Sequence, residues 1–384
     1  MRAGTRRRVR LLLRALCLSV LVGVIIGGAS GSMHLPQLFG LVLGALSGAI
    51  TGAILAVVIG GTEIFLPQTR LGQALDRAPF LVAFTAKWIV YSGVIVLVLG
   101  SMLGRRIAAA LLLGPERAQT LDSHTTAVPA TLGIVLSFLV AFTFNLVFDL
   151  GGLIGQRVLR DIVLGRYHRP RIEDRFFLFI DIAGSTSLAE RIGPTAVHRF
   201  LGEVFRLASD PIEEHEGEVY QYVGDEMVIT WTVAAGRAGT RAAAAFFAVE
   251  RALARSAASF EREFGVVPRL RAALHAGPVI TGEVGGSRRA IVYHGDVMNT
   301  TSRIEQATRD LDRQFLAASA ALERLANLDG FALEDLGLHH LRGRAAPMRV
   351  YAVTTQPSMN GQATAMAEPR LSNHGSQPPA FGRG

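Results

Sequence analysis

Cysteine is almost absent from this sequence, and charged residues are scarce up to about Leu150. Among 384 residues there is one cysteine, Cys17, so no intrachain disulfide can form, which suits a reducing, cytoplasmic environment. Half of the chain is hydrophobic and 18% is charged, and the charges become frequent only from Arg157 onward. This unevenness excludes a single soluble globular domain and predicts two domains in different solvents.

Four long apolar runs occupy the first part of the sequence. Each approaches the length of about 20 residues that a helix needs to cross a bilayer. The runs are Leu11–Gly28, Leu38–Gly61, Pro79–Leu103 and Ala130–Phe148. Residues 1–150 are therefore predicted to form a multi-pass α-helical transmembrane domain of about four helices, in contact with membrane lipid. The first run could instead be a cleaved signal peptide, because basic residues precede it and small residues follow it.

A surplus of arginine produces the net charge of +8. Arginines cluster ahead of the first apolar run and again after the fourth run. A positive-inside membrane signal explains this distribution, so no nucleic acid partner is expected. The same signal predicts a protein of the inner cell membrane whose C-terminal domain lies in the cytoplasm.

Four glycines in the second apolar run recur at every fourth position. They are Gly40, Gly44, Gly48 and Gly52. This period places them along one face of a helix, where two helix backbones can approach closely. The second helix could belong to the same chain or to another copy.

Composition also divides the rest of the chain. Residues 151–172 are amphipathic and rich in arginine, which predicts a juxtamembrane linker helix that ends at Pro170 and either anchors the chain or transmits movement. Residues 173–353 have the composition of a globular domain. Residues 354–384 are rich in Pro, Gly, Ser, Asn and Gln with few bulky apolar residues, so they are predicted to be a disordered tail.

Strands and helices are expected to alternate in the globular domain. Arg175–Ile182 predicts a buried strand and Pro194–His215 a helix. Two short β-rich runs then meet at Gly224 and Asp225, which is a hairpin signal. The further expected elements are a helix over Ala234–Phe264, strands over Leu270–His275, Val279–Val284 and Ala290–Tyr293, and a helix over Val297–Ala307. This order predicts an α+β palm with one mainly antiparallel sheet.

Two aspartates beside turns suggest a metal site. Asp181 ends the first strand before the turn AGST, in which Gly184, Ser185 and Thr186 open a helix whose amides can cradle phosphate oxygens. Asp225 lies at the corner of the hairpin. Alone, each aspartate would more often be a turn residue or a helix cap. A hairpin beside the first strand would bring both carboxylates to one point, and two hard oxygen donors there favour magnesium or manganese.

A second group of polar residues follows in the sequence YHGDVMNTTSRIEQA. Asn299 and Arg303 are four positions apart on a predicted helix, so they share one face. Taken alone, these two polar residues would simply lie on a solvent-exposed face of the helix. Beside a metal-bound triphosphate, the amide could hold the ribose or a phosphate, and the guanidinium could neutralise charge on phosphorus. Arg342, or Arg344 near it, could hold the terminal phosphate or be a surface charge.

Four blocks of the sequence, in order, resemble the catalytic domain of class III adenylate and guanylate cyclases. The blocks are FLFIDIAGST, YQYVGDEMVITW, LHAGPVITGEVG and YHGDVMNTTSRIEQA, and the resemblance covers about Glu173 to Val353. It implies a ferredoxin-like palm that converts a nucleoside triphosphate to a 3′,5′-cyclic monophosphate and pyrophosphate for intracellular signalling. The apolar part ahead of the domain is similar to bacterial membrane-bound members of the family.

The resemblance also implies roles for individual residues. Asp181 and Asp225 resemble the ligands of two Mg²⁺ or Mn²⁺ ions per active site, with the Ile182 carbonyl as an added ligand. Asn299 resembles the asparagine that orients the ribose, and Arg303 the arginine that stabilises the transition state. Arg342 resembles the basic residue that binds the triphosphate. In the family the metal aspartates and the Asn/Arg helix meet across a head-to-tail dimer interface, so a homodimer with two equivalent sites is expected.

Two positions that read the purine depart from the family pattern. Gln221 stands where the family has a lysine that selects adenine, and Val292 stands where it usually has Asp or Thr. The Gln221 amide could still bond to a base edge, because it offers both a donor and an acceptor. ATP is therefore expected from the family as a whole and not from these two residues.

Other functions fit part of the pattern. VGDEM is similar to the GGDEF hairpin of diguanylate cyclases, but the second glycine and the phenylalanine are missing. A catalytically silent membrane receptor or scaffold could keep the fold for dimerisation, although the aspartates, Asn299 and Arg303 are all present. A transporter is disfavoured, because the apolar runs hold no clear set of buried charges beyond Lys87.

Overall fold

The computed structural model describes most of the chain between residues 37 and 356. The described ranges are 37–66, 69–76, 78–113, 154–286, 289–325, 327–341 and 346–356, with single positions within 13–25 and 138–152. Arg342, Arg344 and residues 357–384 of the predicted tail lie outside the described residues. The chain divides into two compact units, Met1–Pro170 with Gly282–Val292 and Arg171–Thr281 with Tyr293–Gly384.

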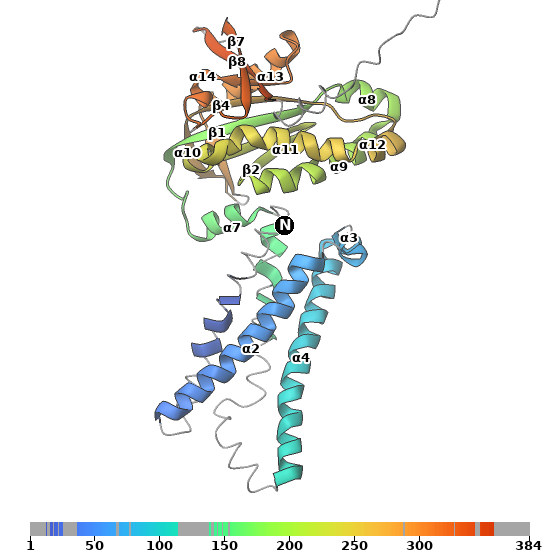
Figure 1. Cartoon of the computed structure of the whole chain (residues 1–384), viewed down its shortest axis with the longest axis vertical. Helices are drawn as coiled ribbons and strands as arrows, with labels where there is room; N and C mark the ends of the chain where they lie inside the picture. The colour runs from blue at the N-terminus through green and yellow to red at the C-terminus, as the bar shows by residue number, and fades with distance from the viewer. Residues whose placement is uncertain are drawn as a thin grey trace, which may run out of the picture. The chain divides into compact units, whose positions relative to one another are not determined.

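The described elements between residues 37 and 170 are helices. They are α2 (Gln37–Phe65), α3 (Arg70–Asp76), α4 (Phe80–Leu113) and α7 (Gln156–Val163). Helices α2 and α4 contact each other (Figure 1). Gly52 of α2 approaches another segment of the same chain, since a Cβ there would lie 2.3 Å from the Ser19 carbonyl oxygen. Close packing within one chain therefore accounts for Gly52. Helix α7 ends at Val163, short of Pro170.

The predicted transmembrane domain over residues 1–150 is contradicted, and with it the predicted inner-membrane location. A membrane span requires one continuous apolar helix of about 20 residues. In the parts of the chain that the structure describes, no helix is long and apolar enough to cross a membrane. Much of the first and fourth apolar runs, including the small residues after the first, lies outside the described residues.

A single eight-stranded sheet, most of which belongs to the second unit, follows in the chain. Its strands are β1 (Arg171–Ile182), β2 (Glu218–Val223), β3 (Glu226–Thr232), β4 (Leu270–Val284), β5 (Ala290–His294), β6 (Phe315–Ala318), β7 (Phe331–His339) and β8 (Met348–Thr355). The order is β2-β3-β1-β4-β6-β8-β7, and β5 pairs with β4. Most neighbours are antiparallel, and β4 and β6 are parallel. The predicted α+β fold with a mainly antiparallel sheet is confirmed.

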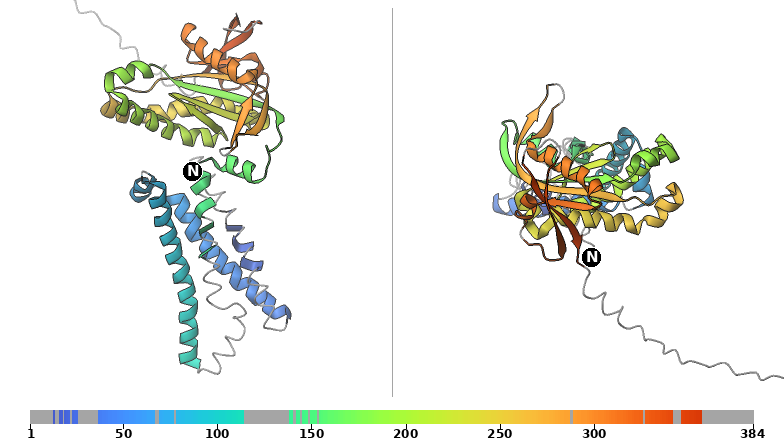
Figure 2. Two further views of the ribbon diagram at one scale, coloured as in Figure 1. Left: turned by 180° about the vertical axis from the view of Figure 1, so that it is seen from behind. Right: turned by 90° about the horizontal axis from the view of Figure 1, so that it is seen from above.

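Helices lie on both faces of this sheet (Figure 2). The helices are α8 (Ser185–Ile192), α9 (Pro194–Glu214), α10 (Val233–Arg237), α11 (Arg241–Arg255), α12 (Ala257–Phe264), α13 (Asp296–Asp310) and α14 (Ser319–Leu322). The single helix predicted over Ala234–Phe264 is wrong, because the chain breaks at Gly239 and Thr240, which both have positive φ, and again at Ser256. The two strands predicted over Leu270–Val284 are one strand, β4.

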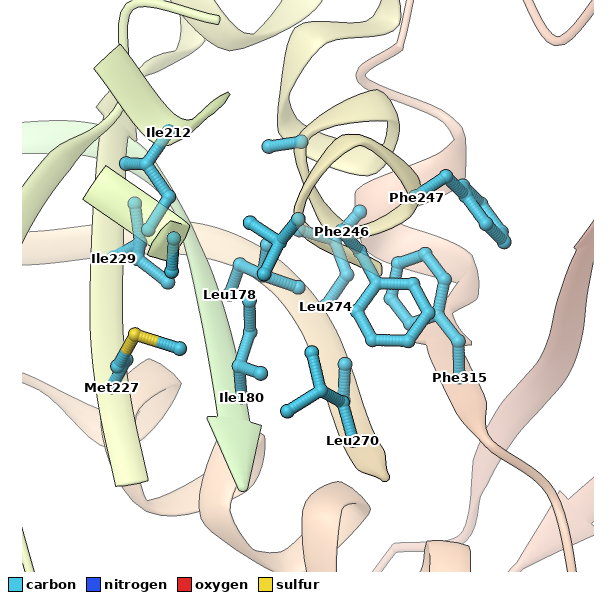
Figure 3. Close-up of a cluster of buried hydrophobic side chains, with 14 of the residues drawn as sticks. Leu178, Ile180, Ile212, Met227, Ile229, Phe246, Phe247, Leu270, Leu274 and Phe315 are labelled. Carbon is cyan, nitrogen blue, oxygen red and sulfur yellow. The ribbon is translucent and has the colours of Figure 1, made fainter. Parts of the chain in front are cut away.

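Alternation along β1 separates the two faces of the sheet. Phe176, Leu178 and Ile180 point into the larger core under α9 and α11, part of which is drawn in Figure 3. Phe177 and Phe179 belong to a second cluster with Val297 of α13. Because side chains alternate with a period of two, the odd-numbered Asp181 lies on the α13 face.

Replacing Leu178 with Ala is expected to lower the free energy of unfolding by about 2–5 kcal/mol. Leu178 is fully buried in the middle of β1, so truncation leaves a cavity that the sheet and helices cannot close. Urea unfolding followed by circular dichroism measures the change. Leu338→Ala on β7 is the control, because this side chain is 61% exposed and its loss should cost less than about 0.5 kcal/mol. Equal losses in the two variants would contradict this assignment of the core.

Candidate active site

The end of β1 holds Asp181 at the edge of the sheet. The residue is 5% exposed, and β1 pairs Asp181 with Arg271 of β4. After Ile182 the amide of Ala183 donates to the Arg269 carbonyl at 2.8 Å, which fixes the chain as it leaves the sheet. Gly184 then adopts φ 77°, and α8 begins at Ser185. A strand end and a helix N-terminus therefore meet at the carboxylate, with the first amides of α8 free of partners within the helix.

The hairpin between β2 and β3 brings Asp225 to the same place. Gly224 has φ 64°, a conformation that favours glycine and lets the hairpin turn tightly. Strand β3 pairs with β1 up to Ile180 opposite Met227, so the hairpin tip lies beside the end of β1. The Ser185 hydroxyl donates to Asp225 Oδ2, which joins the hairpin to the start of α8. The predicted gathering of two carboxylates and the AGST turn is therefore present.

The two carboxyl groups influence each other directly. Burial raises the pKa of Asp181, and the charge of Asp225 and a hydrogen bond between the two side chains raise it further. The Arg309 guanidinium acts in the opposite direction, since it donates to Asp181 Oδ2 at 3.0 Å. Two carboxylates that repel at this range need a positive charge between them to stay ionised.

Two glutamates that the sequence did not single out complete an acidic group around Asp181. Burial, followed by repulsion from neighbouring carboxylates, raises the pKa of Glu226 and of Glu305 to about 7. Glu305 lies on α13, is 5% exposed, and its Oε1 has no hydrogen-bond partner among the described residues. The sequence offered a weak signal, because Glu226 follows Asp225 and Glu305 precedes Arg309 by one helical turn. Neither fact indicated burial.

Asn299 and Arg303 lie on a different face of α13 from Glu305 and Arg309. A helix turns about 100° per residue, so Arg303 is about 160° around the helix from Glu305. Asn299 is exposed, Arg303 is half-buried, and neither side chain has a hydrogen bond or ion pair with the residues that the structure describes. Within one chain, the structure therefore does not bring this pair to Asp181 and Asp225.

The remaining predicted residues lie at the rim of the sheet. Gln221 is exposed on β2 opposite Val228, and Val292 is partly exposed on β5. Next to them, the rings of Tyr220 and Tyr293 are 4.9 Å apart, so β2 and β5 approach each other there. Thr186 is exposed in the first turn of α8. Arg342 falls in a segment that the structure does not describe.

The residues present fit a small divalent cation. Mg²⁺ is commonly held by one or two carboxylates together with water and substrate phosphates, and not by an all-protein cage. Asp181 and Asp225 supply such a pair beside a phosphate-binding turn. In the described ranges, no three His, Cys, Asp or Glu side chains are arranged around one metal position. A pair of carboxylates suits ions that also bind substrate phosphates.

The acidic group should make the metal-free protein less stable as the pH rises. Glu305 has a pKa of about 7 in the folded chain against an ordinary 4.5, so between these values the folded state holds a proton that the unfolded state has lost. The free energy of unfolding should therefore fall as the pH rises from about 5 to 7 and level off above that. Urea unfolding in EDTA across this range measures the slope.

Glu305→Gln should reduce the fall in the free energy of unfolding between about pH 5 and 7. Glu334→Gln is the matched control, since Arg313 lowers the pKa of exposed Glu334 below 4.5 and this carboxyl is predominantly ionised across the range in both states. An unchanged slope in the Glu305 variant would contradict the assignment.

The chain is similar to known proteins. A family model described as "Adenylate and Guanylate cyclase catalytic domain" matches residues 168–355. "Adenylate cyclase 2" of Rhizobium meliloti is 38% identical over 235 residues, 61% of this chain and 64% of the relative. "Adenylate cyclase 1" of the same organism is 30% identical over 46% of this chain and 27% of the relative. The chain thus spans less than two thirds of the length of either relative.

Solved structures also match. A bacterial light-regulated adenylyl cyclase is 22% identical, with a TM-score of 0.42, over 48% of this chain and 91% of that chain. The guanylyl cyclase Cya2 is 20% identical, with a TM-score of 0.43, over 50% of this chain and 96% of that chain.

Proposed function

Because residues 168–355 are a class III adenylate/guanylate cyclase catalytic domain, we propose that this chain closes a nucleoside triphosphate, preferentially ATP, into a 3′,5′-cyclic monophosphate with release of pyrophosphate. The observation that carries the proposal is the meeting of Asp181, Asp225 and the first turn of α8 at one edge of the sheet. The preference for ATP is supported by the two relatives named as adenylate cyclases. The product would serve as an intracellular signal.

Asp181 and Asp225, with the Ile182 carbonyl, would hold two Mg²⁺ or Mn²⁺ ions. Such ions lower the pKa of a bound hydroxyl, here the ribose 3′-hydroxyl, and neutralise charge on phosphate oxygens. The chain's own groups position the substrate. The amides at Gly184, Ser185 and Thr186 open α8 and orient the phosphates. Since the reaction is intramolecular, positioning and charge neutralisation are the main contributions that the protein makes.

A head-to-tail homodimer would supply the rest of each site. On α13 Asn299 is exposed and Arg303 is half-buried, both on a different face from Glu305 and Arg309, so they are available to another subunit. In the proposed dimer Asn299 of the partner subunit orients the ribose. Arg303 of the partner subunit neutralises the charge that develops on phosphorus, for which a guanidinium is well suited. Two equivalent sites result, each built from both chains. Arg342 stays the candidate for the terminal phosphate.

Base selection would fall to Gln221 on β2 and Val292 on β5. The exposed Gln221 amide can donate to one base atom and accept from another. Val292 offers only an apolar contact. We therefore propose weak discrimination between purines at these two positions, with ATP preferred.

Product analysis tests the proposal. The full chain is incubated separately with ATP, GTP, CTP and UTP in the presence of Mn²⁺, and the products are identified by mass spectrometry. Cyclic AMP as the main product supports the proposal. A cyclic dinucleotide from GTP would instead identify a diguanylate cyclase, and no product from any nucleotide would support a silent receptor or scaffold.

A further inference from the structure

Arg309 lies between two carboxylates that belong to different elements. Its Nη2 is 3.0 Å from Oδ2 of Asp181 on β1 and 3.9 Å from Oε1 of Glu305 on α13. The Asp181 and Glu305 side chains are 7% and 6% exposed, whereas that of Arg309 is 57% exposed. The guanidinium can therefore move at the surface, while its two possible partners are fixed and buried.

The position of Arg309 conflicts with cation binding. Oδ2 of Asp181 accepts a hydrogen bond from the guanidinium, and a divalent ion at Asp181 would meet a positive charge there. The guanidinium needs another acceptor if the ion is to bind without strong repulsion.

Glu305 is well placed to be that acceptor. Its Oε1 is buried and has no hydrogen-bond partner among the described residues, which is costly unless a partner arrives in some state of the protein. Glu305 precedes Arg309 by four positions on one helix, which is the favourable order for such a pair. A change of about one ångström in the Nη2 position would turn the present 3.9 Å contact into a hydrogen bond.

Resting on the proposed cyclase site, we propose that Arg309 is a two-position guanidinium that neutralises Asp181 when no divalent cation is bound and transfers to Glu305 when a cation binds. Glu305 is then a positioning residue, which acts by holding Arg309 away from Asp181. Without Glu305, Arg309 keeps its bond to Asp181 and competes with the ion. Without Arg309, the ion binds without this competition, but the repulsion between Asp181 and Asp225 in the metal-free protein is no longer offset.

Mn²⁺ binding to the full chain without nucleotide tests the proposal. Free Mn²⁺ is counted by electron paramagnetic resonance for the wild type, Arg309→Met, Glu305→Gln and the double variant. Arg309→Met should tighten binding and Glu305→Gln should weaken it, each by about tenfold, the size expected for coupled neighbouring charges. In the Arg309→Met background, Glu305→Gln should change binding by less than about twofold. In EDTA, Arg309→Met should lower the Tm.

Arg313→Met is the matched control, because this arginine pairs with exposed Glu334 and should change neither quantity. If Arg309→Met does not fold without metal, Arg309→Gln keeps a donor for Asp181 without the charge. The proposal for Arg309 would be overturned if Glu305→Gln changed Mn²⁺ affinity equally in both backgrounds. Weaker Mn²⁺ binding by Arg309→Met would also overturn it. The cyclase proposal would still stand if the wild type forms cyclic AMP, whereas a wild type that binds no Mn²⁺ without nucleotide would overturn only the proposal for Arg309.

Discussion

Asp181→Asn is expected to lower kcat by about a thousandfold without loss of the fold. The substitution removes a charged ligand of the two proposed metal ions. The electrostatic stabilisation that such ions supply is worth about 4 kcal/mol. It also removes the repulsion between Asp181 and Asp225 that raises the pKa of Asp181. The metal-free variant should therefore be at least as stable as the wild type at pH 8. Steady-state kinetics with Mn²⁺ and urea unfolding measure the two effects.

Asp174→Asn is the matched control for this prediction. Asp174 lies on the same strand but is half-exposed and pairs with Arg324, far along β1 from the acidic group. Its loss should change kcat by less than about twofold, because an exposed ion pair contributes little. An Asp181→Asn variant that keeps more than a tenth of the wild-type kcat would show that this carboxylate does not hold a catalytic ion.

Two inactive variants should restore activity when they are mixed. In a dimer of one Asp181→Asn chain and one Arg303→Ala chain, one site carries both substitutions and the other carries neither. Random exchange makes about half of the dimers mixed, each with one intact site of two, so about a quarter of the wild-type activity is expected. Initial rates after co-refolding or subunit exchange measure the recovery, with mixed dimers shown by differential tags.

A mixture of Asp181→Asn and Asp225→Asn chains is the control. Both substitutions lie in the half of the site that one chain supplies, so every site in a mixed dimer is damaged and no recovery is expected. Recovery in this control, or none in the first mixture despite mixed dimers, would contradict a site shared between subunits.

The strands of the second unit could be predicted because apolar runs and turn residues in the sequence mark where they lie and end. The apolar run before Asp181 and the Gly224-Asp225 turn each specify a strand end, and antiparallel pairing then places the two carboxylates together. Glu226 and Glu305 could not be found in this way. Their burial depends on α13 packing over the end of β1, which joins Arg309 to Asp181, 128 positions apart in sequence.

For the N-terminal unit, composition alone led to a wrong prediction. Apolar runs predicted a membrane domain, but the requirement for a span applies to one continuous helix, and no helix among the described residues satisfies it. Periodicity likewise predicted a single helix over Ala234–Phe264, whereas Gly239 and Thr240 take positive φ and divide it. Local backbone conformation overrode the hydrophobic pattern at that point.

Diffraction at the manganese absorption edge tests the central claim most directly. Crystals of the protein with Mn²⁺ and a non-cyclisable ATP analogue would give an anomalous difference map of the ions. We expect two peaks at one site, each within about 2.2 Å of carboxylate oxygens from both Asp181 and Asp225. Peaks elsewhere, or ions bound by only one of these two aspartates, would contradict the account.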